Sequence, residues 1–302
     1  MPKKPISLLS TLLIFFLLNS FSCFSQFTAL DEQLKAIASN AKGKVSIAAT
    51  LIEDSISYSF YGDERCIMQS VFKFPIALAI LNRVDKGEFS LQHKMHISPK
   101  EMEFKTWSPL RDSLPNGNVN ISFADLIYYS VALSDNVACD VLLRYFKKPK
   151  EVEKYIKSFD IEDFAIKYNE RKMQKNYKNQ YKNYSSPKAM IAILCKFFDK
   201  KILSETNTNF LYDVMLNTET GVNRIKKLLP AGTKVAHKTG TSGTNEQGLT
   251  YAVNDVGILT LSNGKHLALA IFVNESYASV ENMEATIALS AKAIYDFFEK
   301  GN

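Results

Sequence analysis

Cysteine and histidine are scarce in this 302-residue sequence, which has four of each. The cysteines have no metal-like spacing. His93 and His96 could share a helix face, but no third ligand is evident, so the sequence predicts no metal site. Cys23 lies in an N-terminal leader. The remaining Cys66, Cys139 and Cys195 are odd in number and call for no disulfide, and the last two lie in apolar helical stretches typical of a core.

A strong excess of one charge is also absent. The chain has 37 basic and 31 acidic side chains, a formal net charge of +6, which falls to +4 when a leader with two lysines and no acid is removed. The basic cluster Arg171–Lys182 is local and is most simply a solvated loop. With no repeat and no low-complexity tract, the sequence gives no sign of a nucleic-acid partner.

Residues 1–25 contain a long apolar run. Two lysines precede the apolar stretch Leu8–Leu18, and small and polar residues follow it. The stretch is too short to span a bilayer comfortably, so it predicts a secretory signal peptide, cleaved after Ser25. We therefore expect a periplasmic or secreted protein with no membrane attachment. Lipidation at Cys23 is the alternative, but the residues before it are a poor lipidation signal.

Strand patterns occur near both ends of the chain, and helical periodicity fills the middle. The expected strands are Lys44–Ile52, Ser55–Tyr61, Thr233–Lys238, Ala252–Leu261 and Lys265–Asn274. The expected helices are Phe27–Ser39, Ser70–Gly87, Phe123–Leu133, Asn136–Phe146, Lys148–Ser158, Pro187–Phe198, Thr206–Leu216, Gly221–Leu229 and Val280–Glu299. A polar loop is expected at Glu101–Asn118.

This order predicts an α/β protein with an antiparallel sheet made from both chain ends and flanked by the terminal helices. An all-helical domain is inserted into it. The predicted α/β domain comprises residues 26–63 and 217–302, and the predicted helical domain comprises residues 64–216.

The most informative local motif is Ser70 with Lys73. A serine and a lysine three residues apart lie on one helical face, and a buried lysine can lose its proton and activate the hydroxyl. The same spacing starts at Ser39, Ser185 and Ser262, and a surface serine near a surface lysine explains most such matches. Only Ser70 opens a long apolar helix.

Two later motifs single out Ser70. Ser134-Asp135-Asn136 follows a helical run, and Lys238-Thr239-Gly240 ends a strand-like run. Each occurs once, and with the Ser70 motif they stand in the order found in penicillin-recognising serine enzymes. Over nearly all of the mature chain, the sequence resembles the class A serine β-lactamases.

The resemblance implies how a β-lactam would react. Ser70 would attack the lactam carbonyl to form an acyl-enzyme, with Lys73 activating it directly or through a relay. The backbone N–H groups of Ser70 and Thr241 would hold the oxyanion. Ser134 would pass a proton to the departing nitrogen. The resemblance implies neither a metal nor another cofactor.

The implied substrate-binding side chains are Asn136, Lys238, Thr239, Thr241, Arg224 and Trp107. Asn136 would bond the acylamino group, and Lys238 with the two threonines would hold the substrate carboxylate. Arg224 would steer that carboxylate, although without the family pattern a surface arginine capping a short helix is as good an explanation. Trp107 would flank the pocket entrance, whereas a tryptophan in a loop is more often a packing anchor.

Glu170 is the implied general base that activates water for deacylation. Around it the sequence departs from most of the family, with Arg171 and Gln174 in place of proline and asparagine, and with Tyr168 and Asn183 in place of a bracing arginine–aspartate pair. These departures resemble the PER-type extended-spectrum subgroup. They suggest that the loop around Glu170 and the segment 243–248 leave room for bulky oxyimino cephalosporins.

Two other functions share these motifs. A peptidoglycan DD-peptidase would need no Glu170, and a non-catalytic β-lactam sensor would acylate and stop. The sequence shows no transmembrane helix that would connect a sensor to a partner. We expect a monomeric β-lactamase acting on penicillins and cephalosporins.

Overall fold

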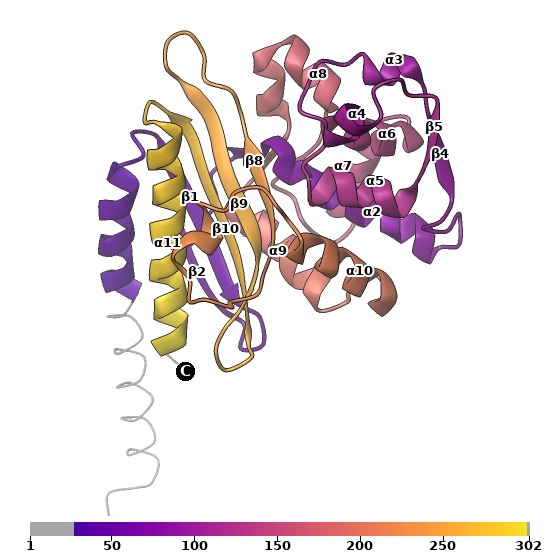
Figure 1. The fold of residues 1–302 in the computed structure, drawn as a ribbon. Coiled ribbons are helices and arrows are strands. Elements are labelled where there is room, and N and C mark those ends of the chain that lie inside the picture. The colour runs from indigo at the N-terminus through magenta and orange to yellow at the C-terminus, as the bar shows by residue number, and fades with distance from the viewer. Residues whose placement is uncertain (1–26, 301–302) are drawn as a thin grey trace, which may run out of the picture.

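The computed structural model describes residues 27–300. Its centre is a five-stranded antiparallel sheet with the strand order β2-β1-β10-β9-β8 (Figure 1). The strands are β1 (Lys44–Leu51), β2 (Ile56–Phe60), β8 (Val235–Thr241), β9 (Thr250–Thr260) and β10 (His266–Ser276). Early and late parts of the chain therefore form one sheet, as the sequence predicts.

Both faces of this sheet are buried. In β10, Leu267, Leu269 and Ile271 face one apolar core, and Ala268 and Ala270 face the other. This alternation follows from the two-residue period of a strand. The sheet therefore needs a layer of helices on each side.

The terminal helices make the first layer. A helix at residues 27–39 and α11 (Val280–Lys300) lie side by side against one face (Figure 1). The rings of Phe27 and Phe297 stack with centroids 5.0 Å apart. On the other face, α9 (Pro187–Phe198) packs against β1 and β10. Among the described residues, no helix is long and apolar enough to cross a membrane.

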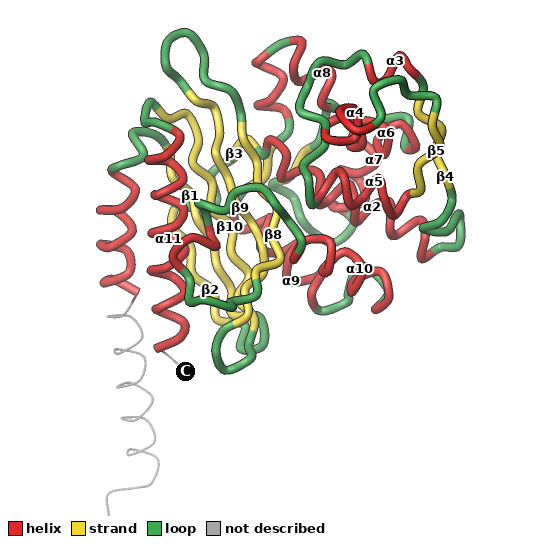
Figure 2. Tube along the Cα trace, viewed as in Figure 1, coloured by secondary structure: helices red, strands yellow, loops and turns green. Residues whose placement is uncertain are grey.

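The middle of the chain forms a second, mainly helical part (Figure 2). Its longer helices are α2 (Lys73–Asp85), α5 (Phe123–Val131), α6 (Asn136–Tyr145), α7 (Lys150–Lys157) and α10 (Glu205–Leu216). Its short helices and 3-10 turns are η1 (Gln69–Phe72), α3 (Pro99–Met102), α4 (Pro109–Ser113), α8 (Glu170–Lys175) and η2 (Tyr177–Lys182). The 3-10 turn η3 (Ile225–Leu228) leads from α10 to β8 and packs against α11.

Two small sheets interrupt this helical part. One pairs β4 (Lys94–Ile97) with β5 (Val119–Ser122), and the other has the order β3-β7-β6. Its strands are β3 (Cys66–Ile67), β6 (Phe164–Ala165) and β7 (Tyr184–Ser185). The second small sheet joins the start of the Ser70 segment to both ends of the loop that carries Glu170.

The long elements confirm the sequence predictions, and the short ones correct them. The expected polar loop Glu101–Asn118 contains α4, and α3 overlaps its start. Each of these helices begins with a serine cap, Ser98 or Ser108, followed by proline at the first helical position, a strong local start signal. The expected helix Gly221–Leu229 is only the 3-10 turn η3. The predicted signal peptide lies outside the described residues.

Candidate active site

Ser70 lies in the 3-10 turn η1, directly before α2. The expected helix therefore starts at Lys73. The chain enters the turn through Gln69, whose φ of 46° is left-handed. Gln69 is held by a hydrogen bond from its side-chain amide to Gln180. Pro75 is the third residue of α2, where a missing N–H is tolerated.

Lys73 Nζ contacts four other residues of the site. Lys73 is fully buried, and its Nζ donates to Ser70 Oγ (3.0 Å), to the Ser134 carbonyl (2.7 Å) and to Asn136 Oδ1 (2.5 Å). Glu170 Oε1 lies 3.0 Å from the same nitrogen as its ion-pair partner. One buried cation therefore connects the side chains of Ser70 and Glu170.

Ser134 stands between α5 and α6 in a left-handed conformation, with a φ of 58° that is unusual for serine. Asp135 fixes this turn, because its carboxylate accepts from Leu110 N (2.7 Å), Ala138 N (2.8 Å) and Ser108 Oγ (2.9 Å). The turn presents Ser134 Oγ to Lys238 Nζ at 2.9 Å.

The edge strand β8 forms one wall of the site. Ser242 N donates to Ala252 O, so the next pair, Thr241 with Val253, is a non-hydrogen-bonded pair. The Thr241 N–H therefore points away from β9, off the open edge of the sheet. Gly240 lets this edge approach the Ser70 turn, because a Cβ there would lie 2.5 Å from the Met68 carbonyl.

Arg224 is buried behind this strand, which excludes a surface role. Its guanidinium donates to Thr241 Oγ1 (2.7 Å) and to the Gly240 carbonyl (3.1 Å), and it pairs with Glu284 (3.0 Å). Arg224 therefore reaches the carboxylate-binding region through Thr241. Thr239 lies on the same strand, and its hydroxyl is bonded to Thr220 at 2.6 Å.

Glu170 begins α8 and is buried. The side chain of Asp140, from α6, holds the backbone at this point. Its carboxylate accepts from Glu170 N (2.8 Å), Arg171 N (3.1 Å) and Asn169 Nδ2 (2.9 Å). Asp140 therefore fixes the start of α8, and with it the direction of the Glu170 side chain.

Asn183 closes the loop at its other end. Its side chain accepts from Lys167 N (2.8 Å) and Tyr168 N (3.0 Å) and donates to the Tyr168 carbonyl (2.7 Å). Backbone hydrogen bonds to one buried amide therefore take the place of an ion pair across the base of the loop. Tyr168 takes part through its backbone.

Burial sets the protonation of two charged groups. Burial, followed by the negative charge of Glu170, raises the pKa of Asp140 to about 7. Burial, followed by the positive charge of Lys73, holds the pKa of Lys238 well below its usual value. Near neutral pH, Asp140 is therefore partly protonated and partly ionised, and Lys238 loses its proton more easily than an exposed lysine does.

A cavity of about 400 Å³ opens over Ser70. Asn136, Glu170 and Thr241 line it together with residues of the Glu170 loop and of segment 242–245. The Asn136 amide donates to Thr106 Oγ1 (2.6 Å), which also accepts from Gln174 (2.5 Å). Thr106 therefore connects the side chains of Asn136 and Gln174 at the wall of the cavity.

Trp107 is not among the residues that line this cavity. Its ring is 62% exposed, and its Nε1 donates to the Leu133 carbonyl at 2.9 Å. The Trp107 carbonyl accepts from Asn136 N at 3.1 Å. Trp107 is thus an exposed anchor of the Ser134 turn, next to the site.

Other catalytic arrangements find no support in the described residues. His237 pairs with Asp255 (2.8 Å), but its Nε2 is buried without a hydrogen-bond partner, so it activates no serine. Within residues 27–300, no three His, Cys, Asp or Glu side chains are grouped to hold a metal. Cys66, Cys139 and Cys195 are free thiols.

Sequence reasoning missed a pair of buried asparagines behind the nucleophile. Asn274 accepts from Ile67 N (2.6 Å), and Asn254 donates to the carbonyls of Ile67 (2.8 Å) and Met68 (3.1 Å). The two amides also bond to each other at 3.0 Å. The only sequence signal for this Asn254–Asn274 pair is an amide in each of two apolar strands. Asp140 was missed too, and its signal is its position one helical turn after Asn136.

The sequence matches the "Beta-lactamase enzyme family" over residues 29–298. Beta-lactamase VEB-1 from Pseudomonas aeruginosa is 38% identical over 271 residues, 89% of each chain. A solved class A β-lactamase from Bacteroides cellulosilyticus is 29% identical with a TM-score of 0.87, covering 91% of this chain and 99% of that one. The chain belongs to the class A β-lactamases.

Two further relatives place this β-lactamase near the PER-like members. The extended-spectrum β-lactamase PER-1 from P. aeruginosa is 38% identical over 279 residues, 92% of this chain and 90% of PER-1. The structure of the TLA-1 extended-spectrum β-lactamase has a TM-score of 0.88 at 38% identity, over 90% of this chain and 99% of that one. The predicted family and fold class are confirmed. The protein is a hydrolase of β-lactam amide bonds, an activity that confers antibiotic resistance.

Proposed function

We propose that this β-lactamase works through an acyl-enzyme on Ser70, which is released by water that Glu170 activates. One observation carries the proposal: Lys73 Nζ lies 3.0 Å from both Ser70 Oγ and Glu170 Oε1. Lys73 can first give a proton to Glu170 within hydrogen-bond reach, and its neutral amine can then accept the proton of Ser70 as the hydroxyl attacks.

The oxyanion that forms during the attack needs two donors. In this proposal they are the backbone N–H groups of Ser70 and Thr241. The strand register supports the second donor, because it turns the Thr241 N–H away from β9. The absence of a side chain at Gly240 supports the close approach of the two segments.

Ser134 is the proposed proton donor to the lactam nitrogen. It bonds to Lys238 at 2.9 Å, and the pKa of Lys238 is well below its usual value because of burial. When Lys238 is protonated, it can replace the proton that Ser134 gives away, and its lowered pKa favours this transfer. Lys238, Thr239 and Thr241 are the proposed carboxylate site, with Arg224 adding positive charge from behind.

We also propose that oxyimino cephalosporins are substrates. PER-1 and TLA-1 are named as extended-spectrum enzymes, and the cavity over Ser70 extends between the Glu170 loop and Gly243. An added Cβ at Gly243 would meet no atom within 4 Å, so this side of the cavity is open. Steady-state kcat/KM should be measurable for an oxyimino cephalosporin, and efficient penicillin turnover without it would refute this part.

The test of the mechanism is intact-mass spectrometry of Gln26–Asn302 with a cephalosporin, sampled over seconds to hours. We expect the wild type to turn over and Glu170→Ala to accumulate one covalent adduct, because deacylation loses its base. Glu162→Ala, an exposed glutamate before the same loop, is the matched control and should turn over like the wild type.

Three outcomes of the same experiment would contradict the proposal. A wild type that stays acylated would indicate a DD-peptidase or a sensor. An adduct in Ser70→Ala would place the nucleophile elsewhere. Equal slowing of acylation and deacylation in Glu170→Ala would show that Glu170 also serves acylation or only folds the loop.

We further propose that the chain is exported, to the periplasm or outside the cell, and acts as a monomer without a membrane anchor. The leader composition of residues 1–25 supports export. Cell fractionation of the full-length chain and light scattering of the mature chain test these two statements. A cytoplasmic precursor that is never cleaved, or a stable dimer, would refute them.

A further inference from the structure

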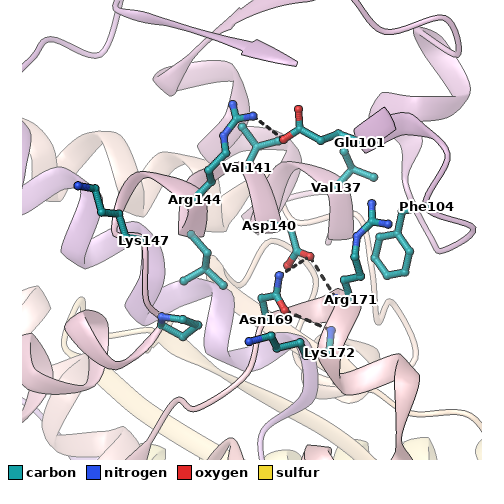
Figure 3. A pocket seen from close by; sticks show the side chains of 12 residues that line it. Glu101, Phe104, Val137, Asp140, Val141, Arg144, Lys147, Asn169, Arg171 and Lys172 are labelled. Carbon is teal, nitrogen blue, oxygen red and sulfur yellow. Dashed lines mark hydrogen bonds and ion pairs between the residues drawn. The ribbon is translucent and has the colours of Figure 1, made fainter. Parts of the chain in front are cut away.

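A second cavity, of about 360 Å³, lies between α6 and the start of α8 (Figure 3). It shares no lining residue with the cavity over Ser70. Three of its lining residues, Asn169, Arg171 and Lys172, flank Glu170 in the sequence. The proposed mechanism uses none of these three side chains.

The walls of this cavity combine apolar surface with positive charge. Val137 and Val141 of α6 and the ring of Phe104 supply apolar surface. Four cationic side chains surround it, and Figure 3 shows them approaching from opposite sides. They are Arg144, Lys147, Arg171 and Lys172.

Three of these cations have no carboxylate partner within the described chain. Arg144 pairs with Glu101 at 2.6 Å, but Lys147, Lys172 and Arg171 form no such pair. The Arg171 guanidinium lies 4.5 Å from the centre of the Phe104 ring, a stacked position that leaves its N–H edge free.

The negative charge in the cavity is already engaged. Glu101 is neutralised by Arg144, and the Asp140 oxygens accept from the backbone and side-chain N–H groups of the Glu170 loop. The cavity therefore has a net positive charge even when Asp140 is ionised. Its apolar walls and free cations complement an anion that carries a compact apolar group.

We propose that this cavity binds a small organic anion, a carboxylate or phosphate on a compact apolar body, and that its occupancy slows turnover. The coupling runs through Asp140, which lines the cavity and holds Glu170 N at 2.8 Å. A bound anion adds negative charge beside Asp140 and favours its protonated form. A neutral carboxyl group accepts a weaker hydrogen bond, so the Glu170 backbone is held less firmly. This kinetic part rests on the proposed role of Glu170, whereas the binding part does not.

The binding part is tested by calorimetry with phenyl phosphate, with inorganic phosphate and phenol as its two halves. We expect phenyl phosphate to bind more tightly than either. The double variant Lys147→Gln/Lys172→Gln removes two exposed charges of the cavity and should weaken binding roughly tenfold. The control Lys94→Gln/Lys234→Gln removes two exposed lysines elsewhere and should bind like the wild type. Equal affinity of both double variants, or of phenyl phosphate and inorganic phosphate, would overturn the proposal.

The kinetic part is tested with a chromogenic cephalosporin at saturating concentration. Phenyl phosphate should lower kcat in the wild type and in the control, and much less in Lys147→Gln/Lys172→Gln. An anion in the cavity over Ser70 would instead compete with substrate and raise only KM. A purely competitive pattern overturns the coupling. If Glu170→Ala accumulates no acyl-enzyme, the role of Glu170 fails, while the calorimetric result still decides whether the cavity binds anions.

Discussion

Two opposing effects act on the ionisation of the Asp140 carboxyl group. It accepts three hydrogen bonds from the Glu170 loop, which favour its ionised form, yet burial and the charge of Glu170 raise its pKa to about 7. Near neutral pH the group is therefore divided between the two forms. The hydrogen bonds to the loop are strongest when it is ionised.

The effect on stability has a definite sign. The pKa of Asp140 is about 7 in the folded chain and about 4 in an unfolded one, so folding takes up a proton between these values. The stabilisation is complete below about pH 4 and is lost as the pH rises through about 7. The free energy of unfolding of the wild type relative to Asp140→Asn should therefore fall by up to a few kcal/mol between about pH 5 and about pH 8.

Urea denaturation across this range measures the difference. Asp63→Asn, on the exposed surface, is the control and should run parallel to the wild type. A difference between wild type and Asp140→Asn that stays constant with pH would contradict the prediction.

Gly240 is the second residue on which the site depends. An added Cβ would lie 2.5 Å from the Met68 carbonyl, so Gly240→Ala must push β8 away from the Ser70 turn. We expect acylation to slow by at least roughly tenfold and stability to fall by about 1–3 kcal/mol. Stopped-flow acylation and thermal unfolding measure both. Gly243→Ala, in open space, is the matched control for stability, and an equal loss of stability from the two substitutions would refute the role of Gly240.

At the scale of elements, β9 and β10 do more than build the sheet. The Asn254–Asn274 pair reaches from these strands to the backbone just before Ser70. These two side chains and the Asn183 carbonyl form hydrogen bonds with the backbone N–H and carbonyl groups of Ile67 and Met68. The strands thereby fix the position of the nucleophile turn relative to the carboxylate site on β8.

Removing either amide should leave buried backbone groups without partners. Asn254→Ala and Asn274→Ala should each destabilise the protein by about 1–3 kcal/mol and lower kcat, and the double variant should cost less than the sum. Urea denaturation and steady-state kinetics give both quantities. Asn120→Ala, on an exposed strand, serves as the control. Additive losses, or losses in stability without any change in kcat, would show that the pair does not act as one unit on the turn.

Elements with a clear period were predictable, and those set by local chemistry or distant contacts were not. The helix Pro187–Phe198 agrees with its prediction because its serine cap, its proline and its apolar face all indicate the same boundaries. The sequence predicted a helix at Ser70, where the structure has a 3-10 turn. The turn begins at the left-handed Gln69, whose side chain bonds to Gln180, far away in the sequence. Asp140 and the Asn254–Asn274 pair act on segments far away in sequence, which periodicity does not reveal.

At the scale of the whole molecule, two apolar cores on either side of one sheet hold the protein together. No cysteine pairing contributes within residues 27–300. Periodicity predicted the strands at both chain ends, but the pairing of β1 with β10 comes from packing. The described structure therefore depends on burial rather than on covalent cross-links.

The three thiols should accordingly be protonated and slow to react in the native enzyme. Burial raises the pKa of Cys66 to about 12 and that of Cys195 to about 11, and it raises the pKa of Cys139 well above its usual value. A thiol reagent should leave Cys66 and Cys139 unlabelled in the native chain, react slowly with the partly exposed Cys195, and label all three thiols after denaturation. A reductant should leave activity unchanged. Rapid labelling of Cys66 or Cys139 in the native protein would contradict this prediction.

The pairing of Lys44 in β1 with Asn274 in β10 also limits when the sheet can fold during synthesis. A ribosome releases the β1–β2 hairpin early, but the strand that covers the other edge of β1 emerges only when synthesis is nearly complete. Until then the nascent chain carries an uncovered strand edge and no finished core on either side of it. For the export that we propose, this strand order would delay folding until nearly the whole chain has been synthesised.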